Sequence, residues 1–385
     1  MIKIGFEELF TFDNLYKAHI KGRVSKRSKR PVVRYEISLS EKIKELHSQI
    51  ITGKYKVGRY NSFIIFEPKQ REIQTLHYSD RIVQHVICDN VIAPYFTKRA
   101  IMDNGVCQIG KGTHFTLKRF EYKLHQFIKR YGNKGYILKC DVFKYFPSVP
   151  HKQLKETILP HFRDKRLRDF MEMIIDSYHT HPEYLKKYDI PVLCKVQQHK
   201  DNGKMWTTGR GIPIGNQTSQ IFGMFYLNKL DRFIKENLRI KIYSRYMDDF
   251  VIVHNDKEYL KEVLAKIQQI VGELGLTLNK KTKIFPLKNG VTYLGFRYQV
   301  TETGKVIKKV SKKTVVRFKA RARLINRAYA DGIINLDKVQ SCLSAYHGHL
   351  KHGNCFKLEQ NLFKRIKVAE IYKSQKEKKN GKQGS

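Results

Sequence analysis

Cysteine and long apolar runs are scarce in this 385-residue chain, and both shortages exclude classes of protein. The six cysteines are scattered, and none is part of a Cys-x-x-Cys pair. This spacing argues against a zinc site or paired disulfides and favours a reducing, cytoplasmic setting. The chain has no run of 18 apolar residues, which argues against a membrane-spanning helix. The N-terminal stretch MIKIGFEELFTFDNLYK mixes acids among its apolar residues, so we expect no signal peptide.

Acidic residues are also few relative to basic ones. There are 35 Asp and Glu against 75 Lys and Arg, which gives a formal net charge of +40 and an isoelectric point near 9.9. A compact fold with this charge repels itself unless a polyanion neutralises it, so nucleic acid is the leading partner. A basic surface kept only for solubility is the plain alternative. Binding to an anionic membrane surface is the remaining explanation of the charge, although the sequence shows no strongly amphipathic terminal helix that would support it.

The hydrophobic periodicity predicts a mixed α+β chain. Alternation and short apolar runs predict a hairpin in 53–71, a buried strand after Gly135, two strands around a tight turn in 240–254, and a strand pair through 292–296. Helical spacing predicts helical pieces in 1–50 around a basic loop (22–34), and helices in 79–96, 113–131, 151–180, 219–238 and 257–274. The helix in 79–96 is expected to end near Pro94.

The C-terminal part becomes rich in Lys, Arg, Ala and Leu and takes a helical period. Ser311 is the expected N-cap of a helix over 312–329. One face of this helix is apolar, formed by Val315, Phe318, Ala322, Ile325 and Tyr329. Another face is basic, formed by Lys312, Lys319, Arg323 and Arg327. The basic face could bind the phosphate backbone of a nucleic acid. The alternative is that these charged side chains are only exposed to solvent.

Two other segments stand out by composition. Residues 181–210 are polar, lysine-rich and contain the only tryptophan, so we expect an insertion loop or a small hairpin there. Residues 373–385 are of low complexity and are expected to be disordered.

Three aspartates carry the chemistry that the sequence predicts. Asp248 and Asp249 lie between two apolar strands, at the tip of the predicted hairpin. The charges of two adjacent aspartates repel each other, and a divalent cation would offset this repulsion. Carboxylate oxygens are the ligands that magnesium prefers. Asp141, 107 residues earlier, interrupts another apolar strand, where an unpaired charge would be costly. Together they predict a site for two magnesium ions and phosphoryl transfer. An Asp-Asp pair on its own is more often only a turn.

At these residues the sequence resembles the reverse transcriptases, over roughly 50–355. DVFKYFPSVPH (141–151) resembles the first catalytic motif of the family, and YMDDF (246–250) resembles the second. The resemblance implies that Asp141, Asp248, Asp249 and the Val142 carbonyl bind two Mg²⁺ ions, for which Mn²⁺ could substitute. It also implies that Phe146 excludes the ribose 2′-hydroxyl.

Weaker motifs extend the resemblance. EPKQREI (67–73) resembles the fingers hairpin, which implies that Lys69 and Arg71 contact the incoming triphosphate. LTLNKKTK (276–283) resembles the lysine-bearing motif near the pyrophosphate, with either Lys281 or Lys283 in that role. TYLGF (292–296) resembles the primer-grip turn.

The implied fold is that of a right-handed polymerase. Its expected regions are an N-terminal region and fingers (1–135), a palm of antiparallel sheet and helices (136–296), a helical thumb (297–365) and a basic tail (366–385). The insertion at 181–210 falls within the palm. The implied substrates are deoxynucleoside triphosphates, a template RNA and the RNA/cDNA hybrid. The sequence has no ribonuclease H carboxylate set and no HNH-type endonuclease after the thumb.

The subfamily signal is GIPIGNQTSQ (211–220). Group II intron enzymes usually carry a Gln-Gly pair here and end in Ser-Pro, whereas this chain has Ile214-Gly215 and ends in Ser219-Gln220. The resemblance to the reverse transcriptases implies that Ile214, Gly215 and Gln220 belong to the nucleotide-binding site. Together with GKGTHF (110–115) and AYHGHLKHGN (345–354), the motif is similar to the enzymes of diversity-generating retroelements. That resemblance implies a bacterial or phage-encoded enzyme that makes errors at template adenines. It also implies a small basic accessory protein that forms a pentamer.

Three alternatives stay open. The first two are a group II intron-like enzyme and a defence-associated reverse transcriptase, and the third is a non-catalytic RNA-binding protein of polymerase fold. A zinc site at His347, His349 and His352 is weighed against a structural or RNA-contacting role, which we favour because no cysteine or acid lies at ligand spacing.

Overall fold

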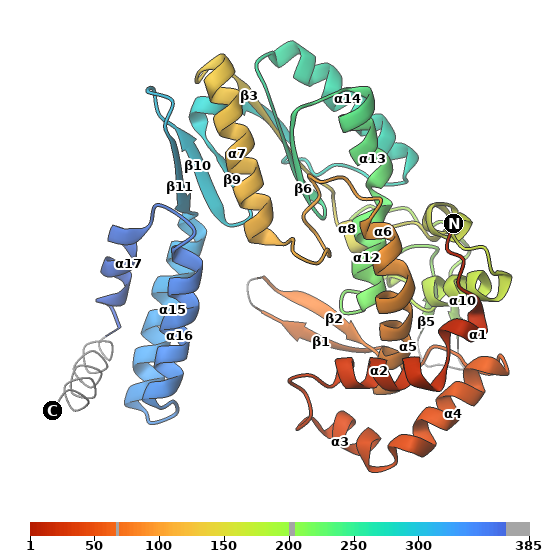
Figure 1. Cartoon of the computed structure of the whole chain (residues 1–385). Helices are drawn as coiled ribbons and strands as arrows, with labels where there is room; N and C mark the ends of the chain where they lie inside the picture. Colours follow the sequence, from red (N-terminus) through yellow and green to blue (C-terminus); the bar gives the residue numbers. More distant parts are fainter. Residues whose placement is uncertain (67–68, 200–204, 367–385) are drawn as a thin grey trace. The chain divides into compact units, whose positions relative to one another are not determined.

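The computed structural model describes residues 1–66, 69–199 and 205–366, which fall into two compact units (Figure 1). The first unit comprises residues 1–112, 139–250 and 261–282. The second comprises residues 113–138, 251–260 and the chain from Lys283 onward. Both units are discontinuous in sequence, whereas the predicted fingers, palm and thumb are continuous stretches. The predicted basic tail lies outside the described residues except for Ile366.

Helices form the N-terminal part of the first unit. They are α1 (Phe6–Leu9), α2 (Phe12–Gly22), α3 (Arg30–Ile37), α4 (Leu39–Ile51) and α5 (Tyr78–Ile87). Helix α2 packs against both α4 and α5. The Thr11 hydroxyl begins α2 by accepting the Asn14 N–H at 3.2 Å. These helices confirm the helical pieces expected in 1–50, but the basic loop expected over 22–34 is shorter than predicted, because residues 30–34 belong to α3.

A two-stranded hairpin follows α4 in the sequence. Its strands are β1 (Asn61–Ile65) and β2 (Arg71–Thr75), and Asn61 pairs with Thr75 and Ile65 with Arg71. Most side chains of β1 are exposed, and in Figure 1 the hairpin stands out from the helices that follow it. The hairpin expected from the alternation is therefore present.

The helical segment expected over 79–96, ending near Pro94, is present. Helix α5 passes through a π-helical turn (Cys88–Ile92) into α6 (Ala93–Thr97), so the helical path ends three residues after Pro94. Pro94 lies in the first turn of α6, where a missing N–H and a fixed φ do little harm. The sequence did not predict the π turn within this path.

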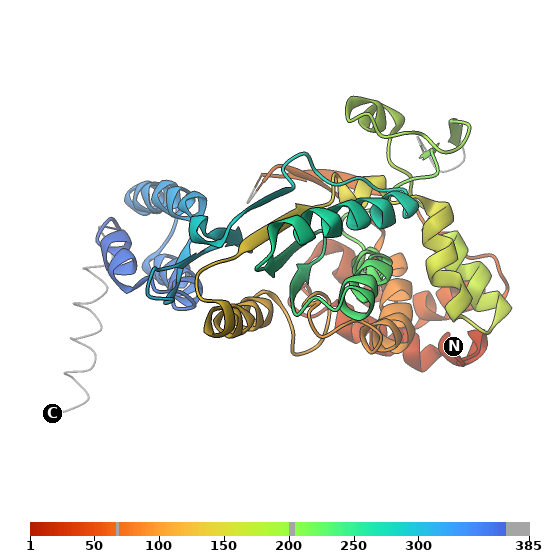
Figure 2. The same ribbon diagram turned by 90° about the horizontal axis from the view of Figure 1, so that it is seen from above.

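Two long predicted helices are each broken into shorter elements. Residues 145–176 form α8 (Tyr145–Ser148), α9 (His151–Ile158), a 3₁₀ turn (Leu159–His161) and α10 (Lys165–Asp176). Residues 217–237 form α12 (Gln217–Tyr226), α13 (Asn228–Arg232) and a π turn (Phe233–Asn237). Between these groups lie α11 (Pro182–Lys187) and a small hairpin of β4 (Gln197–His199) and β5 (Met205–Thr207). In Figure 2 this insertion, coloured yellow-green, stands out from α9 and α10.

The sheet that carries the predicted carboxylates has four strands. They are β3 (Tyr136–Asp141), β6 (Ile242–Tyr246), β7 (Asp249–His254) and β8 (Lys283–Pro286), in the order β6-β7-β3-β8. Helix α14 (Lys257–Glu273) follows β7. Strand β3 therefore pairs with the β6–β7 hairpin, although 107 residues separate Asp141 from Asp248.

The second unit combines a three-stranded sheet with helices. Its elements are α7 (Thr113–Tyr131), β9 (Val291–Tyr293), β10 (Phe296–Val300), β11 (Val306–Val310), α15 (Lys312–Ala330), α16 (Leu336–Leu350) and α17 (Phe356–Phe363). Phe120 of α7 packs edge-on against Tyr293 and Tyr298. The buried Lys308 ammonium pairs with Glu121 at 2.6 Å. Strands β9 and β10 join at Leu294-Gly295, where both residues have positive φ, as a type I′ turn requires.

Helix α15 has the two faces that the sequence predicts. The Ser311 hydroxyl accepts the Thr314 N–H at 3.3 Å and caps the helix. Phe318, Ala322 and Ile325 are buried, whereas the four basic residues of the other face are exposed. The α+β class is confirmed. Within the described residues, no helix is both long and apolar enough to cross a lipid bilayer.

Candidate active site

The turn between β6 and β7 carries two of the three predicted carboxylates. Tyr246 ends β6, Asp249 begins β7, and Met247 and Asp248 form the turn between them. Met247 has a φ of 60°, a left-handed conformation that non-glycine residues rarely adopt. Such an outlier costs of order 1–3 kcal/mol and persists only where the surroundings fix it.

A fully buried ion pair fixes this turn. The Arg245 guanidinium donates to both Asp231 carboxylate oxygens, at 2.7 and 2.5 Å. Two further N–H groups donate to the carbonyl of Met247 at 2.8 Å and to that of Met224 at 2.9 Å. The Tyr243 hydroxyl donates to Asp231 at 2.6 Å. One buried cation therefore holds the carbonyl of the strained residue beside Asp248.

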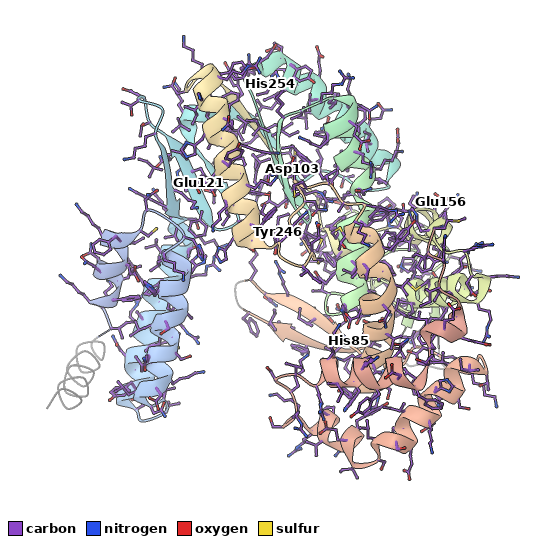
Figure 3. All side chains as sticks on the ribbon, viewed as in Figure 1. His85, Asp103, Glu121, Glu156, Tyr246 and His254 are labelled. Atoms are coloured by element: carbon purple, nitrogen blue, oxygen red, sulfur yellow. The ribbon has the colours of Figure 1, made fainter. Side chains whose placement is uncertain are left out.

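The backbone of β6 is held on its other side by the segment after α6. The Arg245 N–H donates to the Asp103 carbonyl at 3.0 Å, and the Gly105 N–H donates to the Arg245 carbonyl at 3.3 Å. Asp103 and Tyr246 are labelled in Figure 3, which shows this part of the unit. The strand end that carries the Met247-Asp248 turn is thus fixed by side-chain and backbone bonds together.

The fold brings Asp141 to this turn. The Val142 N–H donates to the Asp248 carbonyl at 3.1 Å, so the residue after Asp141 is bonded directly to the turn. Burial, followed by repulsion from Asp141, raises the pKa of Asp248 to about 6. Asn279 supports Asp141: its side-chain amide donates to Asp141 Oδ2 at 3.0 Å, and its N–H donates to the Asp141 carbonyl at 2.7 Å.

A lysine also belongs to the carboxylate cluster. Lys139 precedes Asp141 by two residues on β3, so both side chains lie on one face of the strand. Its ammonium forms an ion pair with Asp249. Burial lowers the pKa of Lys139 to about 7, although Asp141 and Asp248 act in the opposite direction. The cluster therefore holds three carboxylates and one desolvated cation.

These residues suit divalent metal ions. The three carboxylates lie at one end of the two central strands, β3 and β7, and burial followed by repulsion from Asp141 raises the pKa of Asp248. An all-oxygen set of this kind suits Mg²⁺. Asp141, Asp248, Asp249 and the Val142 carbonyl are the residues that would hold it.

Phe146 lies on α8, directly after the strand that carries Asp141. Its carbonyl accepts the Ile212 N–H at 3.0 Å, and its ring lies edge-on to Tyr145 at 5.7 Å. The buried Tyr145 hydroxyl donates to the Gly223 carbonyl of α12 at 2.7 Å. A Cβ on Gly223 would lie 3.4–3.5 Å from Met247, Tyr145 and Phe146. Helix α12 thus passes close to both the predicted gate and the catalytic turn.

The backbone of Ile214 is hydrogen-bonded to Gln74 of the β1–β2 hairpin, and Gly215 lies close to the same residue. The Gln74 N–H donates to the Ile214 carbonyl at 2.8 Å, and the Ile214 N–H donates to the Gln74 side-chain oxygen at 3.2 Å. Gly215 has a φ of 140°, and a Cβ there would meet the Gln74 carbonyl at 2.2 Å. Only glycine fits this close approach, and the Ile214 side chain is half-buried.

The structure gives fewer contacts for the other residues that were predicted to bind the nucleotide. Arg71 is exposed, and its charge acts to lower the pKa of Asp248, so it lies near the cluster. Lys69 and Lys281 are exposed. Gln220 is half-buried on α12, and its carbonyl accepts from the Cys107 thiol at 3.7 Å. Lys283 begins β8 in the second unit, with its ammonium 5.4 Å from the Phe285 ring centroid.

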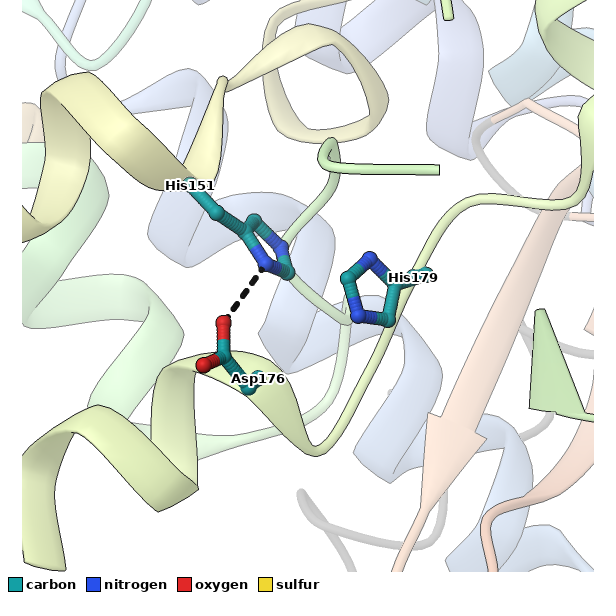
Figure 4. Close-up of side chains that lie close together, drawn as sticks. All are labelled: His151, Asp176 and His179. Carbon is teal, nitrogen blue, oxygen red and sulfur yellow. Dashed lines mark hydrogen bonds and ion pairs between the residues drawn. The ribbon is translucent and has the colours of Figure 1, made fainter. Parts of the chain in front are cut away.

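A group of histidines and one carboxylate lies at the base of the insertion (Figure 4). His151 Nδ1 lies 3.2 Å from Asp176, and its Nε2 lies 2.8 Å from the Gly211 carbonyl. His179 Nδ1 accepts the N–H groups of Thr208 and Gly209 at 3.4 and 3.2 Å. Their ligand atoms lie within 4.8 Å of one another, which metal binding would require.

The hydrogen bonds of this group favour a structural role over a metal site. The Lys155 ammonium already pairs with Asp176 at 2.5 Å, and both nitrogens of His151 face acceptors. The group ties residues 208–211 to α9 and α10.

The three C-terminal histidines are held separately. His347 pairs with Glu359 at 2.5 Å, His349 packs on Phe296, and His352 stacks on His114. Each therefore has a structural contact of its own, in keeping with the structural role favoured from the sequence.

Four polar residues of the site escaped the sequence analysis. Lys139 and Arg245 each interrupt an apolar strand, and this signal was used only for Asp141. Asn279 lies in the motif 276–283, where attention fell on the lysines. Asp231 gives no local signal, because its partner is apparent only once the strand and α13 are packed.

Comparisons with known proteins identify the family of this chain. Residues 66–298, more than half of the chain, match the family "Reverse transcriptase (RNA-dependent DNA polymerase)". Asp141, Asp248 and Asp249 all lie within the matched residues. The chain belongs to the reverse transcriptase family, whose members are RNA-directed DNA polymerases.

Individual relatives are distant. The chain is 24% identical to the COX1/OXI3 intron 2 protein of Saccharomyces cerevisiae, over 57% of this chain and 30% of that protein. The chain thus spans less than a third of the curated relative that it matches. Among solved structures, apo telomerase from Candida tropicalis has a TM-score of 0.45 and 15% identity, over 66% of this chain and 55% of that one. Telomerase from Candida albicans, in complex with a telomeric RNA fragment, has a TM-score of 0.45 and 14% identity, over 75% and 53%.

The buried pair yields a testable prediction. Arg245→Met and Asp231→Leu should each lower the free energy of unfolding by about 3–5 kcal/mol, because each leaves one buried charge unpaired. The double variant should lose less than the sum, since no buried charge remains. Its polymerisation should still be low, because the Met247 carbonyl has lost its donor. Denaturant unfolding and primer extension measure the two effects.

The matched control is Arg232→Met, which breaks an exposed ion pair with Glu236. That change should cost no more than about 1 kcal/mol. A double variant as active as the unchanged protein would show that the guanidinium does not position the turn.

Proposed function

We propose that this chain synthesises cDNA from a template RNA. We also propose that Asp141, Asp248 and Asp249 hold two metal ions and that these ions are Mg²⁺. The observation that carries the proposal is the meeting of these carboxylates, with Asp248 close enough to Asp141 for its pKa to rise. Bound divalent ions would activate a primer 3′-hydroxyl and neutralise the leaving pyrophosphate. The site lies in a chain of net charge +40, which suits an RNA/cDNA hybrid.

The chain's own residues would position the nucleotide. Asn279 holds the Asp141 carboxylate, and the Arg245 guanidinium holds the turn that presents Asp248. Phe146 has no hydrogen-bonding group, so it would exclude a ribose 2′-hydroxyl by occupying its space. Arg71, exposed beside the cluster, is the cation best placed for a triphosphate.

A finer proposal concerns the genetic element that this enzyme serves. The GIPIGNQTSQ motif, with Ile214 where group II intron enzymes usually have glutamine, supports an error-prone enzyme of a diversity-generating retroelement. Such an enzyme would work in a bacterial cytoplasm with a basic accessory pentamer. The second candidate is a group II intron-like enzyme, favoured by the similarity to the yeast intron 2 protein.

The first test separates an enzyme from an RNA-binding protein. Asp248→Asn should abolish primer extension on poly(rA)/oligo(dT) with magnesium, because the amide cannot replace the carboxylate as a metal ligand. RNA affinity should change little, since it depends on many Lys and Arg contacts to phosphate. Asp169→Asn, on the exposed face of α10, is the matched control and should retain activity. Substantial incorporation by Asp248→Asn would refute the assignment of Asp248.

A second test concerns the basic face of α15. Replacing Lys319, Arg323 and Arg327 with Ala should weaken template–primer binding for all sequences alike. Each lost phosphate contact should flatten the plot of log affinity against log salt by about 0.7–0.9. Fluorescence anisotropy across a salt series measures the slope. A slope equal to that of the unchanged protein would mean that this face is only solvated.

A third test uses Ile214 to distinguish the enzyme of a diversity-generating retroelement from a group II intron-like enzyme. Isoleucine offers bulk but no hydrogen bond near the template base, and an A·T pair has only two hydrogen bonds to enforce its geometry. A polar contact of roughly 0.5–1.5 kcal/mol changes selectivity several-fold. Ile214→Gln should therefore lower misincorporation at template adenines more than at the other bases, while activity is retained. Deep sequencing of cDNA from one defined RNA measures this.

The competing explanation is that Ile214 is ordinary packing beneath the Gly215 turn. An adenine error rate identical in the active variant and the unchanged enzyme would favour that explanation and the intron-like reading. Ile212→Val, a buried neighbour on the same segment, controls for packing changes alone.

A further inference from the structure

The insertion at 181–210 contacts the loop that joins Asp141 to Phe146. The Lys144 ammonium lies 3.7 Å from the Tyr188 ring centroid and 5.8 Å from that of Tyr184. Phe143 lies edge-on to the same Tyr188 ring, with centroids 6.2 Å apart. Two consecutive residues of the loop thus rest on one aromatic ring of the insertion.

Lys144 occupies a position where the backbone needs support. Its φ of 45° and ψ of 47° are left-handed, and it is the N-cap of α8, the helix that carries Phe146. A lysine has no intrinsic preference for this conformation. Attraction between the ammonium and the Tyr188 ring favours this conformation, in which the side chain lies over the ring.

The tyrosines themselves are held firmly within the insertion. The rings of Tyr184 and Tyr188 lie 4.8 Å apart. Leu185 between them is fully buried, and its carbonyl accepts the N–H groups of Tyr188 and Ile190 at 3.1 and 3.0 Å. His181 caps α11 by accepting the Glu183 N–H at 3.3 Å. The aromatic pair is therefore an ordered surface rather than two loose side chains.

The two ends of the insertion hold the other side of α8. The Thr180 hydroxyl donates to the Pro147 carbonyl at 3.0 Å, directly before the insertion begins. At its last residue, the buried Arg210 donates to the carbonyls of Ser148 at 2.5 Å and Pro191 at 2.6 Å. Residues 144–148 are thus held at the start by Tyr188 and at the end by Thr180 and Arg210.

We infer that the insertion sets sugar selection, with Tyr188 as a positioning residue that acts through Lys144 on Phe146. This inference rests on the proposed function, in which Phe146 excludes the ribose 2′-hydroxyl. A gate that works by occupying space depends on the position of its ring to within a fraction of an ångström. Releasing Lys144 frees the N-cap of α8 and lets Phe146 move away from the sugar.

The test compares two substitutions at one position. Tyr188→Leu keeps bulk but removes the aromatic face, whereas Tyr188→Phe keeps the face. Steady-state kcat and KM are measured for dCTP and CTP on one template–primer. Tyr188→Leu should reduce the dCTP/CTP discrimination roughly threefold to tenfold, the size expected for loss of one cation–π contact. The loss should come mainly from a higher kcat/KM for CTP, and Tyr188→Phe should match the unchanged enzyme.

Further variants separate the inference from its rivals. Lys144→Met should reproduce the effect of Tyr188→Leu, and the double variant should add little, because both changes break one contact. The Lys144→Met variant also keeps the inference testable if Tyr188→Leu fails to fold. A rise in KM for dCTP and CTP alike in Lys144→Met alone would mean that Lys144 binds triphosphate, which overturns the inference. Tyr122→Leu, at an exposed tyrosine of α7, is the matched control.

Phe146→Ala distinguishes failure of the inference from failure of the proposed function. If the unchanged chain incorporates no dCTP, the proposed function fails. If Phe146→Ala admits CTP but Tyr188→Leu discriminates as well as the unchanged enzyme, only the inference fails. If Phe146→Ala leaves discrimination unaltered, the gate lies elsewhere and the inference falls with it.

Discussion

The buried pair of Arg245 and Asp231 is the interaction on which the active site depends. Removing two charges from water is costly, and such a pair often adds little net stability. Here the guanidinium has a second task, because it donates to the carbonyl of Met247, a residue in a conformation that usually requires glycine. Apolar residues of similar volume could fill this space but could not supply that donor. The pair therefore contributes to the geometry of the turn more than to the stability of the fold, and Asp248 is presented where Asp141 can meet it.

A second constraint follows from the first, because bringing carboxylates together creates repulsion that the fold must tolerate. The raised pKa of Asp248 records this repulsion together with burial. Lys139 offsets part of it through Asp249, and the Asn279 amide offsets part of it at Asp141. In an ordinary protein core, a lysine two residues from an aspartate on the same strand would be unfavourable, because both charged groups would be removed from water. It suits a site in which negative charge is concentrated and a divalent cation completes the balance.

The sequence predicted the parts of this arrangement that local chemistry determines. Helix α15 begins at the predicted Ser311 cap, and the β6–β7 hairpin places Asp248 and Asp249 at its tip, because capping and alternation act over a few residues. The helical segment expected over 79–96 also forms, and it ends at Thr97, close to Pro94. The supporting residues could not be predicted in this way. Arg245, Asp231 and Tyr188 matter through contacts with elements 14 or more residues away, and no local pattern specifies such partners.

Ile214 is one of the positions at which this chain differs from group II intron enzymes, and the structure shows how its backbone is held. The N–H and C=O of Ile214 are both bonded to Gln74, and the Gln74 carbonyl leaves no space for a side chain at residue 215. The backbone path through this motif is therefore set by its pairing with β2 and does not depend on which residue occupies position 214. A glutamine there would follow the same path and differ only in what its side chain offers. Any difference in fidelity that originates at this position must then come from the side chain itself, since the fold gives both residues the same place.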